Sequence, residues 1–265
     1  MSLLKMFLMR ITGNSFAQRL LEKNVGVAQS LMGIGSGGKV ESSGEKAVLD
    51  VLVRKYKPPY YVFDVGSSKG QYLNLLLKLF PLNHLYVHCF EPGTTAFGLL
   101  VESSRRNDRI KLNNIALGKE AGEVTLYFDK PGSELASLTK RKLDHFNIDF
   151  SRSEIITMRT LDNYCLENGI ARIHLLKLDV EGHELDVLAG SFNMLHKNAI
   201  DMVVFEFGGC NIDSRSYFQD FYYFFEKIKM QLFRITPSGY LYPITSYREI
   251  FEQFRTTNFI AMRHG

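Results

Sequence analysis

The chain lacks tryptophan and carries only three cysteines, which lie far apart at Cys89, Cys165 and Cys210. An odd and widely spaced set excludes a disulfide framework, and no pair has the close spacing of a zinc site. Cys89 and Cys210 lie in or beside apolar runs, where a free cysteine behaves as a small hydrophobic residue. We therefore expect a reducing compartment and predict a cytoplasmic location.

Long apolar runs are absent too. No stretch approaches the ~20 residues that cross a bilayer, and the apolar start of the chain, residues 1–11, is interrupted by Lys5 and Arg10. This start has neither a long apolar centre nor a small-residue cleavage site, which argues against a signal peptide. The pattern favours an amphipathic helix packed on the domain, with a helix lying on a membrane surface as the alternative.

A strong excess of either charge is missing as well. The 265 residues hold 32 Lys and Arg against 28 Asp and Glu, a net charge of +4, and the basic residues are dispersed. So small an excess without a basic face predicts no nucleic-acid partner. The composition, 45% hydrophobic and 23% charged, is typical of a globular protein and excludes a mainly disordered chain.

What the sequence does contain is an alternation of short apolar runs with helical stretches. Runs typical of buried strands span residues 61–65, 85–90, 110–115, 174–178, 202–207, 233–236 and 257–262. Helical stretches span residues 15–31, 45–57, 71–80, 94–104, 161–168, 184–195 and 217–225, with another near 247–254. The alternation predicts an α/β fold with a mostly parallel, seven-stranded sheet and an antiparallel last strand.

Two segments depart from this alternation. Strand-like runs at 124–128 and 155–159 enclose a polar stretch, which predicts an inserted β-hairpin over the sheet edge. Residues 1–57 precede the first clear strand and are expected to form an N-terminal helical extension. We therefore expect the α/β domain to span residues 58–265.

Ligands of such sheets bind at the carboxyl ends of the strands, so the residues that follow each strand are the candidates for a site. The first strand ends at Asp64 and turns through Gly66, Ser67 and Gly70, where glycine permits a sharp turn and the close approach of a ligand. The turn has neither the G-x-G-x-x-G fingerprint of dinucleotide sites nor the G-K-[ST] of a phosphate-binding loop. A plain strand-to-helix turn is the alternative for this segment taken alone.

The next two strand ends add polar residues. Glu91 follows the second strand, 27 residues after Asp64, where a carboxylate accepts hydrogen bonds from two ribose hydroxyls. An acidic residue at a helix start is the alternative for Glu91. After the third strand, Asn114 is expected to meet a polar edge of the nucleoside base and Ala116 to leave room for its ring, although both residues equally suit an ordinary turn.

The fourth and fifth strands end in charged residues. Lys177 and Asp179 alternate with Leu178 and share one face, and a lysine in such an apolar run needs a carboxylate partner. His183, at a helix start, is a candidate general base because histidine titrates near neutrality. Glu206 can pair with Lys177, bind substrate hydroxyls or complete a metal site with Asp179. The alternatives are a structural ion pair for Lys177 and Asp179 and an exposed helix start for His183.

These motifs together resemble, in the same order, those of the FkbM-type methyltransferases. They are D-V-G-S-S-K-G at 64–70, E-P at 91–92, A-L-G at 116–118, K-L-D-V-E-G-H-E at 177–184 and the later Glu206. The resemblance covers about residues 61–207, and the stretch at 177–184 is its most specific part. It implies the class I, Rossmann-like methyltransferase fold, S-adenosylmethionine as cofactor and O-methylation of a hydroxyl on a small molecule or glycan.

Each candidate residue then receives a role. The residues expected to bind the cofactor are Asp64, Gly66, Ser67, Gly70, Glu91, Asn114, Ala116 and Asp179. The expected catalytic residues are Lys177, Asp179, His183 and Glu206. A divalent metal is compatible with the carboxylates but is not expected.

The acceptor pocket is expected from the variable segments 33–44, 133–153 and 208–216. Within the first, glycine-rich residues 33–38 suit either a lid over the cofactor or a flexible connector. The aromatic run at 217–225 favours core packing over a sugar platform. Two other functions stay open: a non-catalytic scaffold that binds S-adenosylmethionine, and an RNA methyltransferase, for which no basic groove is visible.

Overall fold

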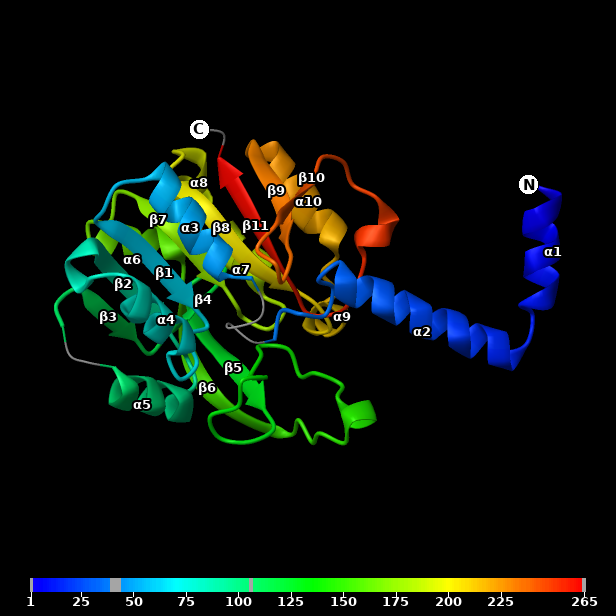
Figure 1. The fold of residues 1–265 in the computed structure, drawn as a ribbon. Coiled ribbons are helices and arrows are strands. Elements are labelled where there is room, and N and C mark those ends of the chain that lie inside the picture. Colours follow the sequence, from blue (N-terminus) through cyan, green and yellow to red (C-terminus); the bar gives the residue numbers. More distant parts are fainter. Residues whose placement is uncertain (1, 39–43, 105–106, 264–265) are drawn as a thin grey trace.

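The chain folds around one large sheet with helices on both faces (Figure 1). The computed structural model describes residues 2–38, 44–104 and 107–263. The strands of the sheet are β1 (Tyr60–Val65), β2 (Leu85–Phe90), β3 (Ile110–Asn113), β7 (Ile173–Leu178), β8 (Ile200–Phe207), β9 (Met230–Ile235), β10 (Leu241–Ile244) and β11 (Thr257–Arg263). They lie in the order β10-β9-β11-β8-β7-β1-β2-β3, which puts β1 and β7 side by side in the middle.

The predicted α/β class and the mostly parallel sheet are confirmed. β3, β2, β1, β7 and β8 pair in parallel, and the last strand, β11, is antiparallel to both β8 and β9. The prediction of seven strands was wrong, because the sheet has eight. The additional strand is β10, which pairs with β9 at the edge and contains Pro243 opposite Phe233. Proline has no amide hydrogen to give to a ladder, so sheets accept it at an edge, and its turn-like signal hides the strand in the sequence.

Helices cover the two faces and bury the strands between them. On one face α3 (Lys46–Lys55), α4 (Gln71–Leu79) and α5 (Thr94–Ser103) contribute to one apolar cluster. On the other face the cluster receives residues from α6 (Leu161–Glu167), α7 (Glu184–Ala189), α8 (Phe192–His196) and α10 (Phe218–Lys227). Phe218, Phe221 and Phe225 of α10 are fully buried, so the prediction of core packing for the aromatic run is confirmed.

Two predicted helices differ from the observed ones. The stretch 184–195 forms α7 and α8, which are separated at Gly190. A Cβ at Gly190 would lie 2.0 Å from the carbonyl oxygen of Gly118, so the chain turns at this glycine to pass close to another segment. The helix expected near 247–254 is only a single 3-10 turn, Glu249–Phe251, after which β11 follows closely.

The insertion between β3 and β7 forms its own small sheet. Its strands are β4 (Ala116–Leu117), β5 (Gly122–Phe128) and β6 (Arg152–Arg159) in the order β4-β6-β5. β5 and β6 pair antiparallel, as the sequence predicts, and β4 joins β6 in parallel. The chain between β5 and β6 loops out beside the carboxyl ends of the large sheet (Figure 1).

The N-terminal helices do not lie where the sequence led us to expect. α1 (Leu3–Ile11) and most of α2 (Ser15–Leu31) project away from the domain (Figure 1), and α2 has no buried residue. The prediction that the first helix packs on the domain is therefore wrong, because the helix finds no apolar partner there. None of the helices in the described part of the chain is both long and apolar enough to cross a membrane.

Candidate active site

A cavity of about 770 Å³ opens at the carboxyl ends of β1, β2, β7 and β8. Residues at or just after the ends of these strands line it, and residues 133–138 of the insertion line another side. Gly37 and Gly38, from the segment after α2, complete the wall. The expected acceptor segment 33–44 thus reaches the cavity, although residues 39–43 lie outside the described residues. Residues from distant parts of the sequence meet here because parallel strands end at one edge of the sheet.

The turn after β1 depends on a glycine. Gly66 has φ of +85°, and a Cβ there would lie 1.8 Å from the carbonyl oxygen of Asp179. The amide of Asp179 in turn donates to the carbonyl of Val65 at 2.9 Å, so the ends of β1 and β7 are in backbone contact. Ser67 lines the cavity and its hydroxyl donates to the carbonyl of Asp64 at 2.7 Å. Gly70 lies outside the cavity lining, where it begins α4 with φ of +88°.

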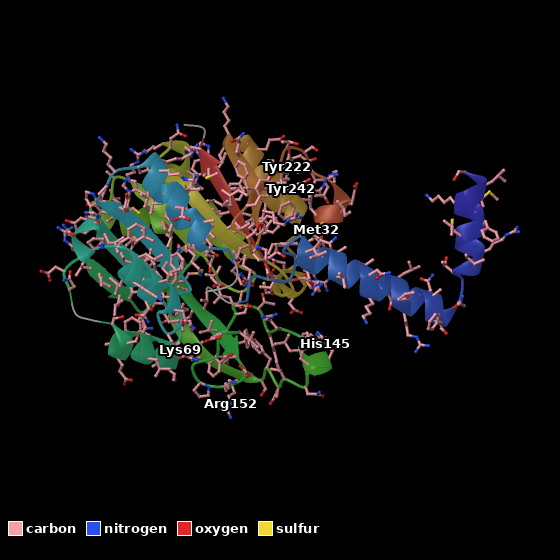
Figure 2. The ribbon with its side chains drawn as sticks, in the orientation of Figure 1. Met32, Lys69, His145, Arg152, Tyr222 and Tyr242 are labelled. Atoms are coloured by element: carbon pink, nitrogen blue, oxygen red, sulfur yellow. The ribbon has the colours of Figure 1, made fainter. Side chains whose placement is uncertain are left out.

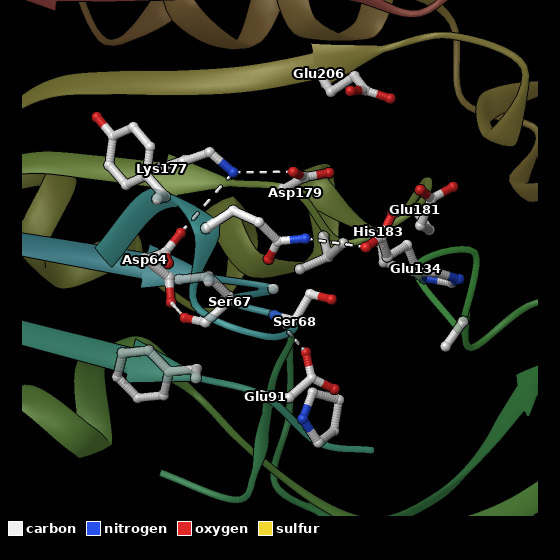
Figure 3. Close-up of a pocket in the computed structure, with 18 of the residues that line it drawn as sticks. Asp64, Ser67, Ser68, Glu91, Glu134, Lys177, Asp179, Glu181, His183 and Glu206 are labelled. Carbon is white, nitrogen blue, oxygen red and sulfur yellow. Dashed lines mark hydrogen bonds and ion pairs between the residues drawn. The ribbon is translucent and has the colours of Figure 1, made fainter. Parts of the chain in front are cut away.

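Glu91 is held in a fixed orientation at one end of the cavity (Figure 3). Its carboxylate accepts from the amide of Ser68 at 2.9 Å and from the amide of Gly93 at 2.8 Å, and the residue is only 7% exposed. Burial raises the pKa of Glu91 to about 7, although both amide hydrogen bonds oppose the change. Ala116 lines the cavity as well. Asn114 does not belong to the described lining, because its side-chain amide donates to the carbonyls of Glu91 and Pro92.

A buried lysine connects two aspartates at the other end (Figure 3). Lys177 Nζ lies 2.9 Å from Asp179 Oδ2 and 3.8 Å from Asp64 Oδ1. Burial lowers the pKa of Lys177, but Asp179, Asp64 and Glu45 more than offset it and raise the pKa well above its usual value. Asp64 is fully buried, and neither of its carboxylate oxygens has a hydrogen-bond partner among the described residues. The predicted pairing of Lys177 with Asp179 is confirmed, and it lies in the wall of the cavity.

His183 is held from both sides. Its Nδ1 lies 2.8 Å from Asp186 Oδ2, and its Nε2 lies 2.9 Å from the hydroxyl of Thr139 in the insertion. The hydrogen bond from His183 lowers the pKa of Asp186, so this carboxylate is favoured in its charged form. With Nδ1–H donating to a carboxylate, Nε2 is the acceptor nitrogen of the ring and accepts from the Thr139 hydroxyl, and His183 lines the cavity. His183 is therefore more than an exposed residue at a helix start.

Three carboxylates meet beside this histidine. Oxygens of Asp179, Glu181 and Glu206 all lie within 4.8 Å of one another, an arrangement that oxygen-preferring divalent cations accept. Asp179 is already paired with Lys177, and Glu181 with Arg141 of the insertion. Burial raises the pKa of Glu181 to about 8. Burial, then Asp179 and Glu181, raise the pKa of Glu206 well above its usual value, so Glu206 favours its protonated form.

Sequence reasoning missed several residues of this site. Glu45 lines the cavity from the segment before α3, and Arg141 pairs with Glu181 from a stretch without regular periodicity. No sequence signal pointed to either residue. Asp186 is different, because it follows His183 by three residues on one helix, where side chains face each other. That spacing was readable in the sequence.

A family model and several known proteins are similar to this chain. A model of the methyltransferase FkbM domain matches residues 64–234. The chain is 26% identical over 182 residues to the 2-O-methyltransferase NoeI of Sinorhizobium fredii, covering 65% of this chain and 74% of NoeI. It is also 26% identical over 166 residues to the hexuronic acid methyltransferase AglP of Haloferax volcanii, covering 62% of each protein.

Among solved structures, the chain is similar to a methyltransferase FkbM from Methylobacillus flagellatus, with 16% identity and a TM-score of 0.47. That match covers 76% of this chain and 43% of the other. This chain thus spans less than two thirds of AglP and less than half of the solved FkbM chain. The family model, in contrast, covers more than half of this chain and includes the carboxyl ends of β1, β2, β7 and β8. The chain therefore belongs to the family of FkbM-domain methyltransferases, which take their methyl group from S-adenosylmethionine.

Proposed function

We propose that this protein methylates a hydroxyl group of a glycan or of a small sugar-like molecule. The observation that carries the proposal is the opposition of two groups across one cavity: the oriented carboxylate of Glu91 at one end, and Lys177, Asp179, His183 and Glu206 at the other. The names of the two curated relatives, a 2-O-methyltransferase and a hexuronic acid methyltransferase, support a sugar hydroxyl as the acceptor.

The residues of the cavity fit the methyl donor. Among the described residues, neither carboxylate oxygen of the fully buried Asp64 has a hydrogen-bond partner, although Oδ1 lies 3.8 Å from Lys177 Nζ, and the Ser68 hydroxyl has none either. A bound ligand would supply hydrogen bonds to these groups. When bound, S-adenosylmethionine supplies a methyl group on a sulfonium. We assign its binding to Asp64, Gly66, Ser67, Glu91, Ala116 and Asp179, which line the cavity, and a supporting role to Gly70 and Asn114, which do not. In this set Glu91 accepts from the ribose hydroxyls, Gly70 shapes the turn and Asn114 supports the backbone beside Glu91.

We assign the role of general base to His183. Nε2 would accept the proton of the acceptor hydroxyl, and Asp186 would stabilise the resulting imidazolium through Nδ1–H. Thr139 occupies Nε2 by hydrogen bonding, so an acceptor hydroxyl takes the place of the threonine hydroxyl. Lys177 and Asp179 orient the acceptor, and Glu206 in its protonated form donates a hydrogen bond to a second sugar hydroxyl.

The test has two steps. Calorimetric titration with S-adenosylhomocysteine measures the donor site, and transfer of labelled methyl to hexuronic-acid-containing oligosaccharides then measures the reaction. His183→Gln is expected to lower kcat by about 10²-fold or more while binding of S-adenosylhomocysteine is unchanged. Asp186→Asn is expected to lower kcat less than His183→Gln and to leave binding of S-adenosylhomocysteine unchanged, because Asp186 acts through the orientation of His183.

Two results would reject the proposal. Binding of S-adenosylhomocysteine without methylation of any hydroxyl acceptor would favour a scaffold, and labelling of RNA would favour an RNA methyltransferase. Activity that persists in His183→Gln would assign the base elsewhere. We expect activity to survive chelation of divalent cations, because two of the three clustered carboxylates already have cationic partners.

We also propose a division into domains and a cellular location for this protein. The first is the division into an extension, residues 1–57, and a methyltransferase domain, residues 58–265. The second is a cytoplasmic location, which the three free and buried cysteines support.

A further inference from the structure

The two N-terminal helices carry a large share of the exposed apolar surface. Of 26 large hydrophobic side chains exposed in the described residues, 13 lie between Leu3 and Met32. Single exposed hydrophobic residues are normal on a protein surface, but a concentration of this kind marks a surface that binds something. The family match begins at residue 64, so these helices lie outside the part shared with FkbM-domain methyltransferases.

Four exposed apolar residues of α2 lie on one side of the helix. Phe16, Leu20, Val27 and Leu31 recur at the spacing that places side chains on one side of an α-helix. Phe16 is 75% exposed and Leu31 is 81% exposed, so the ends of this face are both uncovered. Such a face needs an apolar partner.

In α1 basic residues border the apolar face. Leu3, Phe7, Leu8 and Ile11 are exposed, and helical geometry sets Lys5 at one edge of their arc and Arg10 at the other. Long basic side chains at these edges reach toward phosphate groups while their stems stay among apolar groups. This arrangement is typical of helices that lie in a membrane interface.

The net charge of residues 2–38 favours one kind of partner over others. Residues 2–38 contain four basic residues, Lys5, Arg10, Arg19 and Lys23, and one acidic residue, Glu22. Three of the four net positive charges of the whole chain therefore lie on this short segment. A second copy of the segment would bring like charges together, whereas an anionic lipid surface is complementary to both its charge and its apolar face.

We propose that α1 and α2 dock on the surface of an anionic phospholipid bilayer. The helices lie in the interface and do not span it, in agreement with their lengths. The segment that follows α2 is fixed to the domain, because the amide of Gly37 donates to the carbonyl of Thr256 at 2.9 Å. Gly37 also lines the cavity, so docking holds the cavity beside the lipid surface.

The full-length protein tests this by sedimentation with vesicles of phosphatidylcholine alone or mixed with phosphatidylglycerol. The wild type is expected to sediment with the mixed vesicles and to stay in solution with phosphatidylcholine alone. Phe7→Glu/Leu31→Glu is expected to bind the mixed vesicles at least about tenfold more weakly, because it puts two carboxylates on the apolar faces. Arg19→Gln/Lys23→Gln is expected to bind about tenfold more weakly through loss of charge alone.

A matched control separates this site from general surface effects. Phe192→Glu/Leu166→Glu makes the same two changes at residues that are 56% and 83% exposed, compared with 61% for Phe7 and 81% for Leu31. This variant is expected to bind like the wild type. The proposal fails if the wild type ignores mixed vesicles, binds both compositions equally, or loses binding as strongly in the control variant. It also fails if light scattering shows a dimer that Phe7→Glu/Leu31→Glu dissociates while no vesicle binding occurs, since the occupant is then a second copy.

Discussion

At the scale of single residues, Glu91 is the most direct probe of the donor site. Its carboxylate is oriented by two backbone amides and points its remaining acceptor positions into the cavity. Glu91→Gln keeps the shape but removes the charge, so it weakens hydrogen bonds to ribose hydroxyls. We expect binding of S-adenosylhomocysteine to weaken by about 10- to 100-fold in calorimetric titration. Glu154→Gln is the control, because Glu154 accepts hydrogen bonds from Thr94 nearby but does not line the cavity. Equal affinity of Glu91→Gln and wild type would remove Glu91 from the donor site.

Glu206 makes the stability of the protein depend on pH. Its pKa in the folded protein lies well above the usual 4.5 because of burial and neighbouring carboxylates. The folded state therefore keeps a proton that the unfolded chain releases, and this contribution is complete below pH 4.5 and is lost as the pH rises. Glu206→Gln stays neutral, so it avoids the loss. We expect the variant to match the wild type near pH 5 and to be more stable by about 1 kcal/mol or more at pH 8.

Urea unfolding at both pH values measures this difference. Glu123→Gln is the control, since Glu123 is exposed on β5 and away from the carboxylate cluster. A Glu206→Gln variant that is less stable than the wild type at pH 8 would mean that the charged carboxylate is satisfied in the folded protein. In that case the assignment of a protonated Glu206 to acceptor binding would be wrong as well.

At the scale of elements, the contact between the ends of β1 and β7 depends on Gly66. An alanine there would force a left-handed backbone on a residue with a Cβ and would push that Cβ into the Asp179 carbonyl. We expect Gly66→Ala to lower the free energy of unfolding by at least about 2 kcal/mol and to weaken binding of S-adenosylhomocysteine. Gly98→Ala is the control, because nothing lies within 4 Å of a Cβ at that position of α5. It is expected to be stabilising by up to about 1 kcal/mol, and a Gly66→Ala variant as stable as the wild type would contradict this account of the turn.

The sequence predicted the interior strands of the sheet well, with β2 at its observed bounds and β1, β7 and β8 within two residues of theirs. β7 and β8 are apolar on both faces, and such runs are recognisable without knowledge of their neighbours. Edge strand β10 was missed because only its neighbour β9 and its place at the edge make a proline-containing segment a strand. The break between α7 and α8 depends on the passage of Gly118, which is distant in the sequence.

The residues of the site also fall into two groups, those that the sequence predicts and those that depend on tertiary contacts. Strand-end residues such as Lys177, Asp179 and Glu206 were predictable, because parallel topology alone brings the carboxyl ends of strands together. Arg141 and Thr139 were not predictable, since they reach the site through an insertion whose path over the sheet follows from tertiary packing. Tertiary contacts of this kind leave no periodic pattern in a single sequence.

At the scale of the whole molecule, the fold consists of a cavity-bearing domain and a pair of helices that project from it (Figure 2). The helical conformation of both was predicted from local sequence, but their position was not. A helix with an apolar face is expected to bury that face within its own domain. Here the large apolar side chains of α1 and α2 that we described above are exposed, so their pattern favours binding to a partner outside the chain.

If this division holds, the domain does not need the helices for its stability or for donor binding. α2 buries no residue, and no described residue before Val48 belongs to the apolar clusters around the sheet. Deletion of residues 2–26 keeps Gln29, which hydrogen bonds with Gln253 and Arg255, and keeps Gly37 in the cavity wall. We expect the shortened protein to unfold within about 2 °C of the full chain and to bind S-adenosylhomocysteine with the same affinity. A loss of several degrees in calorimetry would instead show that the helices pack on the domain in solution, because only buried apolar contacts within the same chain would explain a stabilisation of that size.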